Sequence, residues 1–168
     1  MGFNPLITAA LGISEDELIR LVTADVSEVF TTMVDIDDVL HVPHVVDPVK
    51  HFNDCVTAMV GLAGAYNGMV SLHATHSLAM SFTSRMLGME VTEIGPDVND
   101  ALGEIANMLA GSFKQHLTRA GNDVRLSTPS VVNGKEYVIS VGNPQDTLTL
   151  LFDVQSEWFI LSIVLETE

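Results

Sequence analysis

The sequence is poor in cysteine, in basic residues and in long hydrophobic runs. Its single cysteine, Cys55, cannot form a disulfide within the chain, which fits a reducing cytosol. No apolar run approaches the ~20 residues of a membrane-spanning helix, and the longest candidate, "WFILSIVL", suits a buried strand. No basic segment precedes the apolar stretch "PLITAALGI", so we expect no secretory signal. These absences predict a cytoplasmic protein with no membrane segment.

Basic residues are scarce relative to acidic ones. The chain has 7 lysines and arginines against 22 aspartates and glutamates, which gives a formal net charge of -15. Such a surface repels phosphate backbones and anionic lipids, so we exclude nucleic acid and membrane surfaces as partners. Most of this acidity is typical of a surface that keeps a protein soluble. An acidic partner needs a local exception to this charge, or a metal ion between the two surfaces.

The chain also lacks the common motifs of catalysis and metal binding. It has no P-loop, no G-x-S-x-G and no cysteine cluster. Two H-x-x-H pairs occur, His41 with His44 and His73 with His76, but neither has the helical H-E-x-x-H context of a metalloprotease. We interpret these histidines as structural or solvated, and we expect no metal and no cofactor in this chain.

The length of 168 residues and the hydrophobic fraction of 47% predict one domain that spans residues 1–168. Capping residues, periodicity and turn signals predict its elements up to about residue 121. They are a helix from a capping box at Ser14 to about Val34, an irregular connection over 35–53 that can hold an edge strand, a hairpin that turns at Asn67-Gly68, a helix over 76–87, and a long helix from Pro96 to near Gly121.

The last third is predicted to be a strand meander over 123–166. Its predicted turns lie at Asn133-Gly134, in "GNPQD" and in "QSE". Hairpin-connected strands with few helices indicate an α+β fold, in which a largely antiparallel sheet of six strands packs against about three helices. The eight methionines, including Met108, are expected to fill the core.

The segment "DALGEIANMLAG", which starts at Asp100, is predicted to be helical although several of its residues disfavour a helix. Gly103 and Gly111 each cost roughly 1 kcal/mol relative to alanine. Asp100 and Glu104 are like charges one turn apart, and such pairs repel on a helix surface. Asn107 is a mediocre helix former in the middle of the segment. These costs raise the question of what the residues are for.

On a helical wheel, the apolar residues of this helix form one stripe and most of the unusual residues form the opposite one. The apolar stripe, which we expect to face the core, consists of Val98, Leu102, Ile105, Leu109 and Phe113. The opposite stripe consists of Asp100, Glu104, Asn107, Gly111 and Lys114. Gly111 removes side-chain bulk there, so the backbone of a partner could approach closely. An ordinary solvated helix face, with glycines that fit a neighbouring helix, explains the same pattern.

At these residues the sequence resembles the CheC/CheX family of chemotaxis phosphatases, and within it CheX more closely. The family pattern has an acidic residue or serine, Glu after three intervening positions, Asn after two more, and a proline some twenty residues further on. Here these residues are Asp100, Glu104, Asn107 and Pro129. The stretches "VGLAGAYNGMVSLHATHSLAMSFTSRMLGME" and "STPSVVNG" also look like the family's hairpin with its helix and the strand that follows. The resemblance covers most of residues 15–140 and implies a CheC-like fold.

The resemblance implies that the protein removes phosphate from the phosphoaspartate of a CheY-type receiver protein. In this interpretation Asn107 orients the attacking water, because a carboxamide both donates and accepts hydrogen bonds without carrying a charge. Glu104 binds the receiver's active-site lysine, and Mg²⁺ is expected on the receiver rather than on this chain. Asp100, Gly111 and Lys114 are expected to contact the partner.

The family has two structural halves, and the first helix is a candidate for a second copy of the motif helix. With Glu28 aligned on Glu104, the apolar stripes of the two helices coincide, but Thr31 falls on Asn107. The first helix thus keeps the packing stripe and lacks the amide, which is typical of a single-site, CheX-like member. A chance match of two amphipathic helices explains the alignment nearly as well.

Three functions stay open at this point. The chain is a phosphatase of a phosphorylated receiver, a receiver-binding adaptor without hydrolytic activity, or a dimeric structural domain that retains the motif. The intact Asp100, Glu104 and Asn107 favour the first over the second. We also expect a homodimer, because CheX-like proteins pair and the meander over 123–166 leaves edge strands that need covering.

Overall fold

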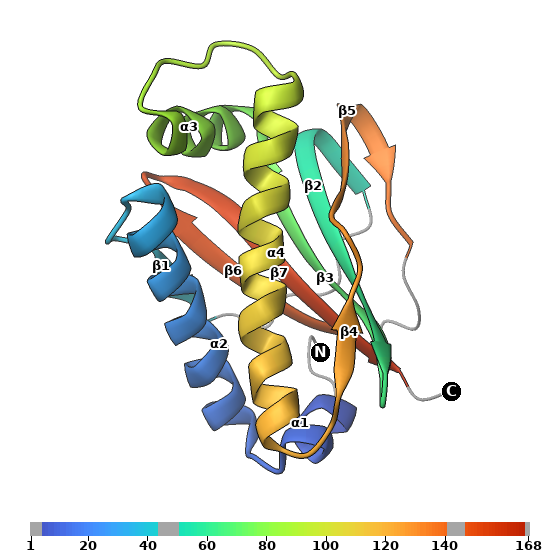
Figure 1. Cartoon of the computed structure of the whole chain (residues 1–168). Coiled ribbons are helices and arrows are strands. Elements are labelled where there is room, and N and C mark those ends of the chain that lie inside the picture. Colours follow the sequence, from blue (N-terminus) through green and yellow to red (C-terminus); the bar gives the residue numbers. More distant parts are fainter. Residues whose placement is uncertain (1–4, 44–50, 141–146, 167–168) are drawn as a thin grey trace.

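The computed structural model describes residues 5–43, 51–140 and 147–166, and it shows a layer of helices on an antiparallel sheet (Figure 1). The described residues form four α-helices, one π-helical turn and seven strands. These elements are, in chain order, α1 (Pro5–Leu11), α2 (Glu15–Val29), η1 (Phe30–Val34), β1 (Leu40–Val42), β2 (His51–Gly64), β3 (Asn67–Thr75), α3 (His76–Leu87), α4 (Pro96–Arg119), β4 (Val124–Leu126), β5 (Ser130–Val138), β6 (Thr147–Val154) and β7 (Glu157–Glu166).

The strands form one sheet in the order β1-β6-β7-β3-β2-β4, and β5 also pairs with β2. Every pairing among the described strands is antiparallel. The predicted α+β fold is therefore confirmed, although the sheet has seven strands where six were predicted, and α1 adds a helix. The edge strand allowed for in 35–53 is β1, which has only three residues. Elements as short as β1 and α1 give too few residues for a clear periodic signal.

The first hairpin is confirmed, but its Asn-Gly pair does not form the turn. Gly68 already pairs with Leu62 in β2 and with Leu165 in β7, so the connection precedes it. A Cβ atom at Gly68 would overlap the carbonyl oxygen of Val164. Glycine is therefore needed at this position because β7 approaches the backbone closely, not because the chain turns there.

The turn predicted at Asn133-Gly134 is wrong, since both residues lie inside β5. They pair with Val56 and Cys55 of β2, whose 14 residues offer a partner along the whole of β5. Ladder hydrogen bonds to this long neighbour override the local preference of an Asn-Gly pair. The turn predicted in "QSE" is confirmed at Gln155 and the residue after it, both with positive φ, whereas "GNPQD" lies outside the described residues.

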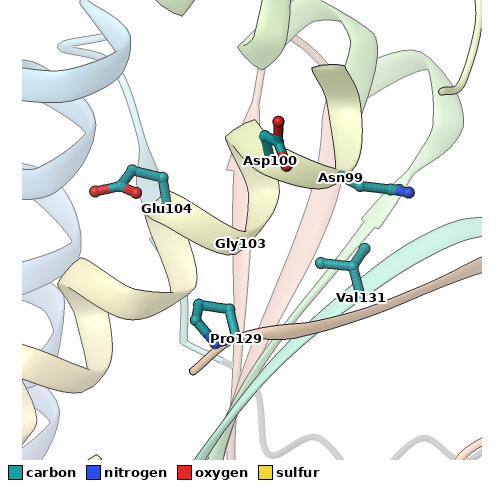
Figure 2. Close-up of a pocket in the computed structure, with 6 residues that line it drawn as sticks. All are labelled: Asn99, Asp100, Gly103, Glu104, Pro129 and Val131. Carbon is teal, nitrogen blue, oxygen red and sulfur yellow. The ribbon is translucent and has the colours of Figure 1, made fainter. Parts of the chain in front are cut away.

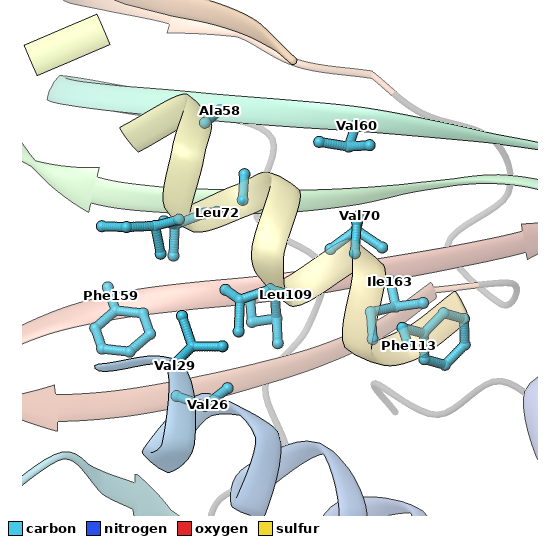
Figure 3. Close-up of a cluster of buried hydrophobic side chains, with 14 of the residues drawn as sticks. Val26, Val29, Ala58, Val60, Val70, Leu72, Leu109, Phe113, Phe159 and Ile163 are labelled. Carbon is cyan, nitrogen blue, oxygen red and sulfur yellow. The ribbon is translucent and has the colours of Figure 1, made fainter. Parts of the chain in front are cut away.

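Helix α4 crosses the sheet with α2 beside it, and the core lies between this layer and the strands (Figure 1). Figure 3 shows Leu109 and Phe113 of α4 among side chains from β3, β7 and α2. All five residues of the predicted apolar stripe are at most 3% exposed, which confirms the rotation of α4 read from its periodicity. The stripe consists of Val98, Leu102, Ile105, Leu109 and Phe113.

Helix α2 begins and ends near the predicted positions. The Ser14 side chain accepts a hydrogen bond of 3.2 Å from the backbone N–H of Glu17, as expected of the capping box. The last turn is π-helical and stops at Asp35, whose φ of 60° lies in the left-handed region. Arg85 of α3 donates to the Asp35 carbonyl oxygen at 2.9 Å and so links the two helices. No helix within the described part of the chain is long and apolar enough to cross a membrane.

A buried polar cluster surrounds His73 on the sheet face opposite the helices. Its Nδ1 lies 2.7 Å from the hydroxyl oxygen of Thr57, which lies 2.8 Å from the hydroxyl of Tyr137. The ring of Phe52 stacks on the imidazole, with 4.4 Å between the centroids. Burial lowers the pKa of His73 to about 4 and raises the pKa of Tyr137 to about 12. His73 is therefore a neutral, structural side chain at physiological pH, which agrees with the sequence interpretation.

We expect His73 to make folding stability depend on pH. Its pKa falls from an ordinary value of 6.5 to about 4 on folding, so the unfolded chain binds the proton more tightly. The free energy of unfolding should fall as the pH is lowered through this window, by as much as ~3 kcal/mol. His73→Gln keeps an acceptor for Thr57 and does not titrate. The free energy of unfolding of this variant should therefore fall less than that of wild type over the same pH range. Equal pH slopes for the two proteins in urea unfolding would contradict this account.

Candidate functional site

The candidate site lies on the face of α4 that points away from the sheet. Asp100 and Glu104 are exposed, whereas Asn107, Gly111 and Lys114 are half-buried along the same stripe. The structure thus places all five predicted residues opposite the apolar stripe. Pro96 occupies the first turn of α4, where its missing N–H costs nothing because that group has no partner within the helix.

An open cleft of about 480 Å³ separates the N-terminal half of α4 from β5. Its walls are formed by Asn99, Asp100, Gly103 and Glu104 of α4, and by Pro129 and Val131 across from them (Figure 2). The structure therefore brings three residues of the sequence motif, Asp100, Glu104 and Pro129, to one place. Asn107 follows one turn after Glu104, outside the residues that line the cleft.

Gly103 allows the two walls of the cleft to meet at its floor. A Cβ atom at Gly103 would lie 3.4 Å from the Cβ of Pro129 and 3.6 Å from a methyl carbon of Val131. Gly111 differs, because a Cβ atom there would meet no atom within 4 Å outside its own helical turns and chain neighbours. Neither glycine fits a neighbouring helix: Gly103 accommodates β5, and Gly111 faces open space.

Three motif side chains have no polar partner in the described part of the chain. Among residues 5–43, 51–140 and 147–166, no hydrogen bond or ion pair joins the side chains of Asp100, Glu104 or Asn107 to another group. Figure 2 shows the Asp100 and Glu104 carboxylates projecting from the helix, and Asn99 pointing to another side. Two unpaired carboxylates and an unpaired amide on a rigid helix can bind a cation and position a small polar molecule.

Sequence reasoning missed two residues near the site, one beside the cleft and one at the edge of the exposed stripe. The Asn133 side chain of β5 donates a hydrogen bond of 3.0 Å from Nδ2 to Oδ1 of Asn99. The Asn-Gly pair predicts a turn at Asn133, so no local signal indicates this contact. Met108, expected in the core, is 43% exposed and lies directly after Asn107. Its position at the edge of the exposed stripe was visible on the helical wheel, and the general preference of methionine for cores was misleading there.

The first helix keeps the packing role of a motif helix without its functional groups. Val22, Val26 and Val29 are buried against the core, and Val26 and Val29 lie near Leu109 of α4 (Figure 3). Glu28 is exposed, and the exposed Thr31 lies in the π-helical turn, with its hydroxyl 3.5 Å from the carbonyl oxygen of Ile36. No amide stands where Asn107 stands in α4.

The histidine motifs do not form a metal centre in the described part of the chain. His73 belongs to the buried cluster in the sheet, and His76 is the first residue of α3. His41 lies in β1 with its ring 5.5 Å from that of Phe152, whereas His44 lies outside the described residues. Within 5–43, 51–140 and 147–166, no group of three or more histidine, cysteine or acidic side chains could hold a metal ion.

The fold and the site define a protein in which a long helix packed on an antiparallel sheet presents a row of outward-facing polar side chains beside an open cleft. Comparison with known proteins makes this more specific. The family model described as chemotaxis phosphatase CheX matches residues 56–153, more than half of the sequence. The chain therefore belongs to the CheX family of chemotaxis phosphatases, and the matched residues include the whole of α4 and Pro129.

Individual relatives agree with this assignment. The CheY-P phosphatase CheX of Thermotoga maritima is 28% identical over 124 residues, which cover 71% of this chain and 79% of that protein. The crystal structure of CheX from Desulfovibrio desulfuricans matches with a TM-score of 0.75 and 27% identity, over 89% of this chain and 99% of that one. The fold is also shared by CheX in a CheX–CheY–BeF₃–Mg²⁺ complex from Borrelia burgdorferi, with a TM-score of 0.73, 18% identity, and coverage of 89% and 97%.

The two glycines of α4 should respond differently to valine. Gly103→Val places methyl groups against Pro129 and Val131, so we expect it to lower the free energy of unfolding by about 1–3 kcal/mol. Gly111→Val meets no such contact, and valine is slightly the better helix former, so its stability should be unchanged or raised by a few tenths of a kcal/mol. Urea unfolding of both variants measures this difference. Equal losses would show that Gly111 is also packed against something.

Proposed function

We propose that this chain hydrolyses the aspartyl phosphate of a CheY-type receiver, with Asn107 orienting the attacking water. The observation that carries the proposal is the unpaired Glu104 and Asn107, which share an exposed stripe of α4 and follow one another by a single turn. Family membership supports it, as does a relative that is a CheY-P phosphatase. The Borrelia complex of CheX with CheY, BeF₃ and Mg²⁺ supports a receiver as the partner, and in this proposal Mg²⁺ is bound by the receiver.

The proposed reaction needs no nucleophile from this chain. Water attacks the phosphorus, the bond from phosphorus to the aspartate oxygen breaks, the side-chain carboxylate of the receiver's aspartate is regenerated, and inorganic phosphate leaves with the protons of the water shared between it and solvent. The amide of Asn107 accepts a hydrogen bond from the water and can donate one to a phosphoryl oxygen, which holds the water in line. This role is like that of the water-positioning glutamine in GTPases.

Glu104 is the proposed anchor. Its carboxylate has no cation beside it in the described structure, so an ammonium group of the receiver can become its partner without displacing another. Asp100 adds a second negative charge one turn earlier, and Gly111 leaves room beyond Asn107 for a partner backbone. Lys114 continues the same stripe as a further proposed contact. The net charge of -15 opposes receiver binding less at this point, because the proposed contact point on the receiver carries a cation.

A cytoplasmic location is part of the same proposal. Receivers of this type are phosphorylated on an aspartate, and the resulting acyl phosphate is accessible to an enzyme in the same compartment. The single cysteine agrees with this, because Cys55 is buried and burial raises the pKa of its thiol. A buried thiol with a raised pKa is poorly reactive, so Cys55 serves packing.

Asn107→Ala should abolish most phosphatase activity and leave the fold intact. We expect turnover of phosphorylated receiver to fall on the order of 10²-fold or more, because the water loses its orienting group. Stability should be unchanged or raised by a few tenths of a kcal/mol, since alanine is the better helix former. Glu104→Ala should weaken receiver binding as well as slow turnover, because it removes a charge. Phosphate release from receivers charged with acetyl phosphate measures both variants.

The first helix offers matched controls for this experiment. Glu28→Ala and Thr31→Ala remove the aligned positions of α2, and each should keep activity within about tenfold of wild type, ~1.4 kcal/mol in the barrier. A larger loss would make α2 a second working site. If Asn107→Ala hydrolyses the phosphorylated receiver as fast as wild type, Asn107 does not have the proposed role. If wild type binds the receiver without hydrolysing it, the chain is an adaptor.

We also propose that the protein is a homodimer joined through a sheet edge. The edge strand β1 exposes 66% of Leu40, and β5, at the other side of the sheet, exposes 57% of Val138. Exposed apolar side chains on unpaired edges are typical of strands that need a neighbour. Light scattering at tens of micromolar, a rough concentration for a stable pair, should give twice the chain mass. A monomer under these conditions would contradict the proposal.

A further inference from the structure

The wall of the cleft opposite α4 is shaped by an irregularity between β4 and β5. Leu62 of β2 pairs with Leu126, and Met59 pairs with Ser130. The chain therefore advances four residues from Leu126 to Ser130, whereas the paired segment of β2, from Leu62 to Met59, spans only three. The extra residue is a β-bulge, and bulges re-aim the side chains beside them. Here the side chain that is re-aimed onto Gly103 of α4 is Pro129.

The hydroxyl of Ser127 holds the bulge on its N-terminal side. The backbone N–H of Ser127 donates to the carbonyl oxygen of Gly61 at 2.9 Å, and the N–H of Gly61 donates to the Ser127 hydroxyl oxygen at 2.8 Å. The hydroxyl in turn donates to the carbonyl oxygen of Thr128 at 3.0 Å. A side chain thus takes the place of a ladder carbonyl, two residues before a proline that has no N–H to donate. A Cβ atom at Gly61 would lie 3.3 Å from this hydroxyl oxygen, so Gly61 leaves the room that it needs.

The amide of Asn133 holds the same wall on its C-terminal side. It donates to Asn99 in the second turn of α4 and so ties β5 directly to the helix that carries Glu104. Pro129 and Val131 lie between the two attachments, at Ser127 and at Asn133. Neither Ser127 nor Asn133 lines the cleft. Both lie in the stretch "STPSVVNG" that resembles the family, but neither is one of the four motif residues Asp100, Glu104, Asn107 and Pro129.

We propose that Ser127 and Asn133 are positioning residues that set the distance between β5 and α4, and through it the width of the cleft that receives the partner. This inference rests on the proposed function, because it names what determines receiver binding at the same site. It separates two tasks along α4. The cleft beside Asp100 and Glu104 decides how well the receiver binds, whereas Asn107, one turn outside the cleft, acts on the water. Loss of either attachment should therefore change KM for the phosphorylated receiver more than kcat.

The asparagine pair allows a test that separates positioning from charge. In Asn99→Asp, the new carboxylate still accepts the hydrogen bond from the Asn133 amide. In Asn133→Asp, the new carboxylate can accept a hydrogen bond from the Asn99 amide, once that amide has rotated to present its N–H group. The double variant Asn99→Asp with Asn133→Asp sets two carboxylates against each other. Each single variant adds one charge, and Asn99 lines the cleft, so the measured quantity is the departure from additivity. We expect the double variant to raise KM about tenfold more than the product of the two single effects, with the product of the kcat effects kept within about threefold. KM effects that simply multiply would overturn the proposal.

Ser127 is tested by removing and restoring its hydroxyl. Ser127→Ala should raise KM by about three- to tenfold at nearly unchanged kcat, and Ser127→Thr, which retains a hydroxyl, should restore it. Thr8→Ala in α1 is the control. The Thr8 hydroxyl donates a hydrogen bond to the carbonyl oxygen of Pro5 in its own helix, and Thr8 is distant from Ser127 in the sequence. A lower melting temperature for Ser127→Ala with an unchanged KM would make the bond merely structural and overturn the proposal.

The substrate in these assays is the receiver from the same genome that the wild-type protein dephosphorylates fastest after charging with acetyl phosphate. If wild type hydrolyses none of them, the proposed function fails, and binding of each receiver activated with BeF₃⁻ is measured instead. Weaker binding by Ser127→Ala and by the double aspartate variant then supports positioning without catalysis. Unchanged binding overturns it, so failure of the function and failure of the inference are distinguished.

Discussion

The packing of α4 against the apolar face of the sheet sets the direction of every side chain in the site. Each residue of its buried stripe removes from water a side chain worth about 1.5–3 kcal/mol. Rotation of the helix by one residue, about 100°, would carry Glu104 toward the core and Leu102 toward solvent. The core therefore determines which residues face outward, and Glu104 and Asn107 need no contacts of their own to hold their direction.

This arrangement explains why costly residues are tolerated on the outer stripe. Asp100 and Glu104 repel each other, Gly111 adds backbone freedom, and Asn107 contributes little to the helix, yet none of them carries the packing. Because none has a partner within the described structure, each remains available to another molecule. Polar groups held on a rigid helix lose little freedom on binding, which is what a positioning role requires.

The opposite wall of the cleft depends on the sheet instead of on the helix. A bulge, a proline and two glycines allow β5 to approach α4 beside the motif residues, with Gly61 leaving room for Ser127 and Gly103 leaving room for Pro129. The far face of the sheet contributes rigidity through the buried cluster around His73. Helix and sheet thus supply one wall each, and the cleft exists only because both are held in place.

The sequence by itself determined the helices, the antiparallel sheet and the outward stripe of α4, because helical periodicity and capping act between residues a few positions apart. The family pattern identified Pro129, which lies across the cleft from α4. Only the tertiary structure decided that Asn133 lies within a strand and that the chain bulges before Pro129. The reason is that these features rest on contacts between distant residues, such as Asn133 with Asn99, 34 positions apart, and Ser127 with Gly61, 66 positions apart. A long paired strand can override a local turn preference, and no short stretch of sequence contains both partners.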